Sequence, residues 1–281
     1  MSHWDGFLMI DWSGGNDTGP KPRKDAIWAG AVMDGVEHAP VYLRNRVVAA
    51  EWLTQQIDTA LDTGKRLFLG FDFPFAYPGG FARKVTGLGD PLSLWAYFAD
   101  ALVDTPKSNS RFALAAELNN LFCGVGPFWF NGTKEDFPHL PRKGRARQGH
   151  GMPERRHCET RAKGTFTCWQ MGGAGAVGGQ VMTGLATLEK LRRAFPGQIG
   201  VWPFDLSDQP IAFVEIWPSL LADAVTAEDD PIKDRAQVRL MARALARLPR
   251  AALDDMLAVD APEEGWILGL GHEEALKEAL C

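Results

Sequence analysis

The stretch FLMIDWSGGNDTG, residues 7–19, decides the fold, because its apolar run ends on Asp11 and then breaks into a glycine-rich turn. A short continuous apolar run bounded by turn residues is typical of a buried strand. A single acid in this place is commonly a turn-forming side chain. The same arrangement recurs twice along the chain, which indicates a shared role for these acids.

Three apolar segments near the N-terminus predict an antiparallel meander. They are GFLMID at 6–11, AIWAGAVM at 26–33 and APVYLRNRV at 39–47. The Asp34-Gly35 pair between the second and third segments is a strong signal for a tight hairpin. We therefore expect three consecutive strands of one sheet.

A helix and a buried strand are expected next. Apolar residues from Ala50 to Leu61 recur at helical spacing, and Gly64 is placed to end the helix. The segment RLFLGFDFPFAYPGG at 66–80 then begins as a near-continuous apolar run and stops at Pro74. This strand carries a second acid, Asp72, at its exit.

The last strand and helix form the third repeat of this arrangement. IAFVEIW at 211–217 predicts a strand with Glu215 near its end. The helix that follows is expected to have Asp230 as its N-cap and Pro231 in its first turn. Four arginines at intervals of four residues are expected on its solvent-facing edge: Arg235, Arg239, Arg243 and Arg247.

Residues 81–205 break the regular pattern, and we interpret them as one large insertion with helical pieces near 91–103 and 110–122. The glycine cluster GGAGAVGG at 172–179 leads into a further helix. Its amides would suit an anion at a helix N-terminus, but a flexible hinge or tight packing is the favoured interpretation.

A basic segment at 142–163 lies within the insertion and holds eight Lys or Arg residues and two Glu. The whole chain has a formal net charge of −5, so this segment is a local exception and a candidate anion contact. The predicted substrate-binding residues in it are Arg155, Arg156, Arg161 and Lys163. A solvated loop is the alternative.

The composition favours a folded globular protein. Of 281 residues, 46% are apolar and ten are tryptophan, enough for a sizeable core. The longest apolar stretch, at 121–130, is too short for a membrane span, which needs about 20 residues. No secretion signal is present at the N-terminus. We expect a cytoplasmic protein with no membrane contact.

The four cysteines give no disulfide framework and no zinc-finger spacing, so free thiols are expected. A zinc ion is a weaker alternative because the spacing of its candidate ligands is irregular. Those candidates are His150, His157, Cys158 and Cys168.

Three strands of one sheet that end on Asp11, Asp72 and Glu215 can bring their carboxylates to one edge. Like charges repel, so such a group needs a cation. Oxygen ligands of this kind suit Mg²⁺ or Mn²⁺, which would stabilise both oxygens of a phosphoryl transfer. The sequence therefore predicts a metal-dependent site.

The order of these elements resembles the ribonuclease-H-like fold. The motifs FLMIDWS, LFLGFDFP, FVEIWPSL and KDRAQVRLMARAL are similar to those of an uncharacterised family, a domain of unknown function, within that superfamily. The resemblance implies one α/β domain over residues 1–281, with the insertion at about 81–205. Its sheet would be mixed, with the three-strand meander beside parallel strands and helices on its faces.

The resemblance also implies a set of site residues. Carried over by motif, the metal ligands and catalytic residues are Asp11, Asp72 and Asp234, with Glu215 as an additional candidate. A structural acid at the start of its helix is an equally good interpretation of Asp234. Ribonucleases H place a further glutamate on the first helix, where this chain has Glu51.

Several functions fit these features. The first is a nuclease-like phosphodiester hydrolase that uses Mg²⁺ or Mn²⁺ on a nucleic acid or nucleotide. The second is a small-molecule phosphotransferase, because IDWSGG also looks like the phosphate-binding hairpin of the sugar kinase and actin group, with Ser13 as a phosphate contact or a turn residue. A similar Asp-Trp-Ser opening occurs in proteins labelled for molybdopterin-guanine dinucleotide synthesis. A non-catalytic member of the fold is the last alternative.

Overall fold

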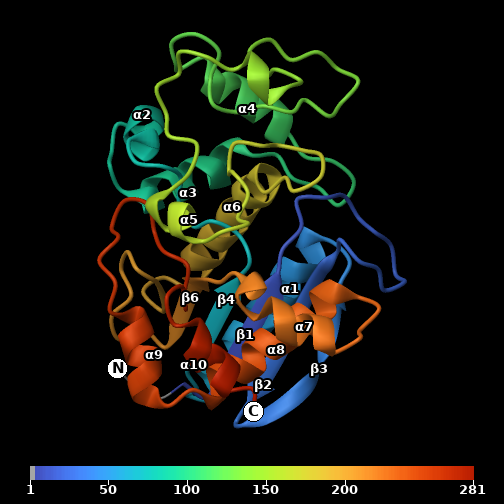
Figure 1. Cartoon of the computed structure of the whole chain (residues 1–281), viewed down its shortest axis with the longest axis vertical. Helices are drawn as coiled ribbons and strands as arrows, with labels where there is room; N and C mark the ends of the chain where they lie inside the picture. The colour runs from blue at the N-terminus through green and yellow to red at the C-terminus, as the bar shows by residue number, and fades with distance from the viewer. Residues whose placement is uncertain (1–3) are drawn as a thin grey trace. The chain divides into compact units, whose positions relative to one another are not determined.

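The computed structural model describes residues 4–281, and within them one six-stranded mixed sheet has the order β3-β2-β1-β4-β6-β5 (Figure 1). Its strands are β1 (Gly6–Asp11), β2 (Ile27–Met33), β3 (Val36–Leu43), β4 (Leu67–Phe71), β5 (Ile199–Val201) and β6 (Ile211–Glu215). β1, β2 and β3 pair antiparallel, while β4, β6 and β5 continue the sheet as parallel strands. This confirms the α/β class and the mixed sheet.

The meander forms where the sequence predicts it, with one correction to its third strand. Met33 pairs with Val36, so Asp34 and Gly35 alone make the turn, and both adopt positive φ (51° and 76°). β3 therefore begins at Val36 and ends at Leu43, rather than spanning 39–47. It ends there because Asn45 caps α1 (Arg46–Asp62), accepting the N–H of Val48.

Helix α8 (Lys233–Arg247) packs directly on β1 and β2. A Cβ at Gly30 of β2 would lie 2.5 Å from the backbone carbonyl oxygen of Val238, so only glycine allows this approach. Figure 1 shows α8 on one side of the strands and α1 on the other. The two helices exclude water from the two faces of the sheet.

The start of α8 differs from the prediction. The helix begins at Lys233 after Ile232, so Asp230 is not its N-cap residue. Asp230 instead accepts the N–H of Ile232 and pairs with Arg235 at 2.7 Å. Because the helix starts later, Asp234 is its second residue, at the exposed end of its first turn.

The arginine row of α8 forms ion pairs along the outer edge of the helix. Arg235 pairs with Asp230, Arg239 with Glu228, and Arg243 with Glu37.

By its internal contacts the chain divides into two compact units. The first holds the sheet and consists of residues 1–73, 191–261 and 266–281. The remaining helices are α2 (Phe81–Thr86), α3 (Pro91–Ala101), α4 (Arg111–Asn119), α5 (His157–Arg161), α6 (Gly178–Ala194), α7 (Ala222–Ala227), α9 (Arg250–Leu257) and α10 (Glu273–Glu278). α3 and α4 confirm the helical pieces predicted near 91–103 and 110–122.

The second unit, residues 74–190 with 262–265, overlaps the predicted insertion at 81–205 but starts and ends earlier. Its core is aromatic: Tyr77 lies 4.6 Å from Phe81 and 5.1 Å from Trp169, measured between ring centroids. All four cysteines are free, as expected. Within residues 4–281, no helix has the length and apolar character needed to cross a bilayer.

Candidate functional site

Asp11 and Asp72 leave neighbouring strands at the same level of the sheet. β1 and β4 are parallel, Ile10 pairs with Phe71, and the N–H of Asp72 donates to the carbonyl of Ile10 at 2.9 Å. A Cβ at Gly70 would lie 2.5 Å from the sulfur of Met9, so these paired positions share a face. Since side chains alternate along a strand, Asp11 and Asp72 also share that face.

The shared face is the one that α8 covers. Met9 pairs with Gly30 of β2, the glycine against which α8 packs. The first turn of α8 brings Asp234 to the same end of the strands, where its Oδ2 accepts the N–H of Asp25 at 2.9 Å. The structure thus brings together three of the four predicted metal ligands on one face.

The electrostatics of this acidic cluster, Asp11, Asp72 and Asp234, show that its charges are poorly compensated. Desolvation raises the pKa of Asp11 well above its usual value, and Asp72, Asp234 and Asp25 raise it further. Desolvation, followed by the charges of Glu215 and Asp234, raises the pKa of Asp72 to about 7. Asp11 and Asp72 remain partly accessible to solvent. A cation that reaches them would favour their charged forms.

Glu215 lies near the cluster but comes from the other face of the sheet. It pairs with Phe71 of β4, the residue between Gly70 and Asp72, so its side chain starts on the opposite side. Glu215 is buried, and its charge raises the pKa of Asp72. Its electrostatic influence reaches the site, while its role as a ligand stays a prediction.

The acidic cluster is not a preformed metal cage. Within residues 4–281, no three His, Cys, Asp or Glu side chains are arranged as a group that could hold a metal ion. The donor set nevertheless has the right chemistry for a hard cation, because Asp11, Asp72 and Asp234 supply only carboxylate oxygens. Binding by all three therefore requires their side chains to draw together.

The predicted substrate contacts of the basic segment lie in the second unit and differ in their environments. Arg156 is fully buried, donates to Glu159 at 2.9 Å and donates to the carbonyl of Glu264 at 3.1 Å. Arg155 donates to the carbonyl of Thr165. The segment is thus folded rather than a solvated loop. Arg161 and Lys163 are exposed, and a contact between this segment and substrate stays a prediction.

The loop after β1 is held by its own hydrogen bonds. Ser13 Oγ donates to the carbonyl of Asp25 at 3.2 Å and accepts the N–H of Gly15 at 3.1 Å. The buried guanidinium of Arg46 donates to the carbonyls of Ser13 and Gly15. These contacts give Ser13 the role of a turn residue in the structure described. Glu51 is exposed on α1, and its predicted role as a ligand is not supported by any contact of the acidic cluster.

The glycine cluster at 172–179 makes close packing contacts. The N–H of Gly178 donates to the carbonyl of Gln170 at 2.9 Å, and a Cβ on Gly178 would lie 2.6 Å from the carbonyl oxygen of Cys168. This contact supports the tight-packing interpretation for that end of the cluster.

Two charged residues beside the acidic cluster escaped the sequence analysis. Asp25 precedes β2 and raises the pKa of Asp11 and of Asp234. Lys233, the first residue of α8, lowers the pKa of Asp72 by its charge. A usable signal for Asp25 was its position just before the strand that pairs with the end of β1.

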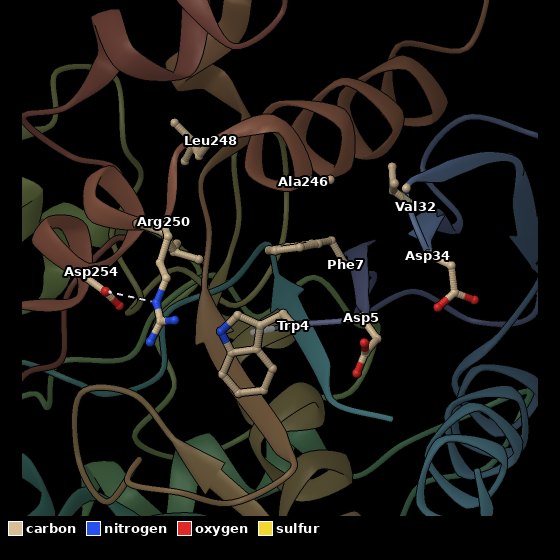
Figure 2. A pocket seen from close by; sticks show the side chains of 11 residues that line it. Trp4, Asp5, Phe7, Val32, Asp34, Ala246, Leu248, Arg250 and Asp254 are labelled. Carbon is tan, nitrogen blue, oxygen red and sulfur yellow. Dashed lines mark ion pairs between the residues drawn. The ribbon is translucent and has the colours of Figure 1, made fainter. Parts of the chain in front are cut away.

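A pocket of about 490 Å³ lies at the other end of β1, with Trp4 and Phe7 among its apolar lining residues (Figure 2). Each of its carboxylates already has a partner: Asp5 accepts the N–H of Arg66, Asp34 pairs with Lys65, and Asp254 pairs with Arg250. This pocket therefore lacks the uncompensated charge that marks the acidic cluster.

Comparison with known proteins leaves the chemistry of the site to be argued from the residues themselves. No protein-family model matches the chain, and no curated protein or solved structure is significantly similar to it. The resemblance to the ribonuclease-H-like superfamily therefore remains a prediction from the motifs.

Proposed function

We propose that the protein is a metal-dependent phosphoryl-transfer enzyme, specifically a nuclease-like phosphodiester hydrolase that uses Mg²⁺ or Mn²⁺. The observation that carries this proposal is the pair Asp11 and Asp72, which leave adjacent parallel strands on one face with raised pKa values. Clustered carboxylates at strand ends are the donors that a hard divalent cation prefers.

The order of the elements adds support. A meander, a helix, a strand ending on an acid, a large insertion, and then a strand and a helix bearing Asp234 agree with the order that the resemblance implies. Fold alone does not determine activity, so the argument rests on the acidic cluster.

In this proposal Asp11 and Asp72 hold the cation and Asp234 completes the set. The bound cation would supply Lewis-acid stabilisation and a more acidic water. The N–H of Asp25 orients the carboxylate of Asp234, and the ammonium of Lys233 is placed to attract a phosphate oxygen beside Asp72. The half-exposed carboxylates leave the site open to a phosphodiester.

A small-molecule phosphotransferase is the second candidate, because the loop after β1 is glycine-rich and ordered. In the structure described, the hydroxyl of Ser13 accepts the N–H of Gly15, so this amide already has a partner. An ATP-induced increase in melting temperature with Mg²⁺ would favour the phosphotransferase. The molybdopterin-related label and a non-catalytic role remain alternatives that the same assay addresses, since neither predicts metal-dependent cleavage.

Cleavage of labelled DNA and RNA with Mg²⁺ or Mn²⁺ tests the proposal. We expect metal-dependent cleavage that falls by at least about 100-fold in Asp11→Asn and Asp72→Asn, since each removes a charged ligand. Asp58→Asn, an exposed acid of α1, is the matched control and should retain activity. Cleavage that survives both site substitutions would contradict the assignment.

A further inference from the structure

Four basic side chains near the acidic cluster have no ion pair within residues 4–281. Lys21, Arg23 and Lys24 are exposed in the loop between β1 and β2, and Lys233 is exposed at the start of α8. Three arginines of α8, by contrast, pair with acids. Uncompensated cations on a chain of net charge −5 form a local site of attraction for anions.

A pocket of about 440 Å³ lies beside these cations. Pro22 of the loop, Trp28 of β2 and Tyr42 of β3 contribute to its lining. Trp28 pairs directly with Asp11, and Tyr42 pairs with Trp28, so the three residues form a row across adjacent strands. Neighbouring strands lie about 5 Å apart, so the pocket begins one strand away from the acidic cluster.

The aromatic part of the pocket is fixed by hydrogen bonds. Trp28 Nε1 donates to the carbonyl of Arg23, and the hydroxyl of Tyr42 donates to the carbonyl of Gly19. The two rings lie 5.2 Å apart between centroids, and the guanidinium of Arg235 lies 5.6 Å from the Trp28 ring centroid. The same contacts hold the basic loop against the pocket.

The pocket combines the features that single-stranded nucleic acid requires. Aromatic and proline surfaces accept the flat face of a base, while adjacent cations neutralise the backbone phosphates. Its volume of about 440 Å³ is in the range of small-ligand sites. A base can enter such a pocket only when it is unstacked, which favours a single strand over a duplex.

We propose that Lys21, Arg23 and Lys24, together with the Trp28–Tyr42 pocket, form a subsite for single-stranded nucleic acid. One unpaired base occupies the pocket, and the flanking phosphates contact the basic loop. This inference deepens the proposed function and rests on it for the position of the scissile phosphate at Asp11 and Asp72. It identifies single strands as the substrate class.

Fluorescence anisotropy with labelled oligonucleotides in EDTA tests binding separately from cleavage. The triple substitution Lys21→Ala, Arg23→Ala, Lys24→Ala should weaken single-strand binding by at least about 10-fold. It should also reduce the slope of log K against log salt by about 2, since each lost phosphate contact removes about 0.7. Tyr42→Ala should weaken binding by about 5-fold or more through lost stacking.

The matched control is the triple substitution Lys107→Ala, Lys134→Ala, Lys190→Ala, which removes the same charge from exposed positions elsewhere. We expect it to bind like the parent chain, and we expect a duplex of equal length to bind more weakly than the single strand. Equal binding by the two triple variants, or tighter binding of the duplex, would overturn the subsite. Circular dichroism and thermal melting confirm that each variant is folded.

The two proposals fail in different ways. Loss of binding in the loop variant without any metal-dependent cleavage would leave the subsite standing and remove the hydrolase. Cleavage that needs Asp11, combined with unchanged binding in the loop variant and in Tyr42→Ala, would do the reverse.

Discussion

Asp11 and Asp72 emerge side by side from parallel strands, and the N–H of Asp72 donates to the carbonyl of Ile10, the residue before Asp11, at 2.9 Å. This backbone contact fixes two carboxylates on one face of the sheet. Their desolvation and mutual repulsion raise both pKa values. The apo protein therefore carries an electrostatic cost that a divalent cation would relieve.

The first prediction concerns pH. The pKa of Asp72 is about 7 in the folded chain against 3.8 for an unperturbed Asp, so between these values the folded state binds more protons. The free energy of unfolding should therefore fall as pH rises from about 4 to 7, by at most about 1.4 kcal/mol per pH unit for this group. Urea denaturation across this range measures the slope. Asp72→Asn should flatten it, and an unchanged slope would count against the assignment.

The second prediction concerns the balance of stability and metal binding. Asp11→Asn should raise the free energy of unfolding of the apo protein by about 1 kcal/mol or more, because it removes a desolvated and repelled charge. The same variant should lose most of the stabilisation that saturating Mn²⁺ gives to the parent chain. Denaturation with EDTA and with Mn²⁺ measures both effects, and Asp58→Asn should show neither.

The third prediction concerns the approach of α8 to the sheet. Gly30→Ala should destabilise the chain by about 1–3 kcal/mol, because the added methyl would meet the backbone of Val238 rather than a movable side chain. It should also reduce cleavage, since α8 carries Asp234. Ala31→Ser, at the next position along β2, is the control. Equal stability of the parent chain and Gly30→Ala would show that the contact is looser than described.

The fourth prediction concerns the second unit. Arg156→Ala should destabilise it by about 3–5 kcal/mol, because Glu159 would remain buried without its partner. Replacing both residues with apolar side chains should restore much of this loss. Urea denaturation followed by tryptophan fluorescence compares the three chains. A small effect of the single change would indicate that Glu159 finds another partner.

The meander was predictable because its signals are local. Strand alternation and the Asp34-Gly35 turn act within a few residues. The short strand β5 was missed because three residues carry too little periodicity. The N-cap of α8 was misplaced because the carboxylate of Asp230 bonds Ile232 and Arg235 before the helix begins.

The site was predictable only in part. Strand-terminal acids marked Asp11 and Asp72, but the face occupied by Glu215 depends on the register between β4 and β6, which is a tertiary property. The burial of Arg156 depends on Glu159 and on the distant Glu264. Asp25 reaches the acidic cluster through a hydrogen bond to a residue 209 positions away. Pairings over such distances leave no periodic trace in a single sequence.

The most direct test of the central claim is anomalous diffraction from crystals soaked in Mn²⁺. We predict a peak between the ends of β1 and β4, about 2 Å from carboxylate oxygens of Asp11 and Asp72. The peak should be lost in crystals of Asp11→Asn. A saturating soak that gives no peak there, or an equal peak in the Asn variant, would contradict the account.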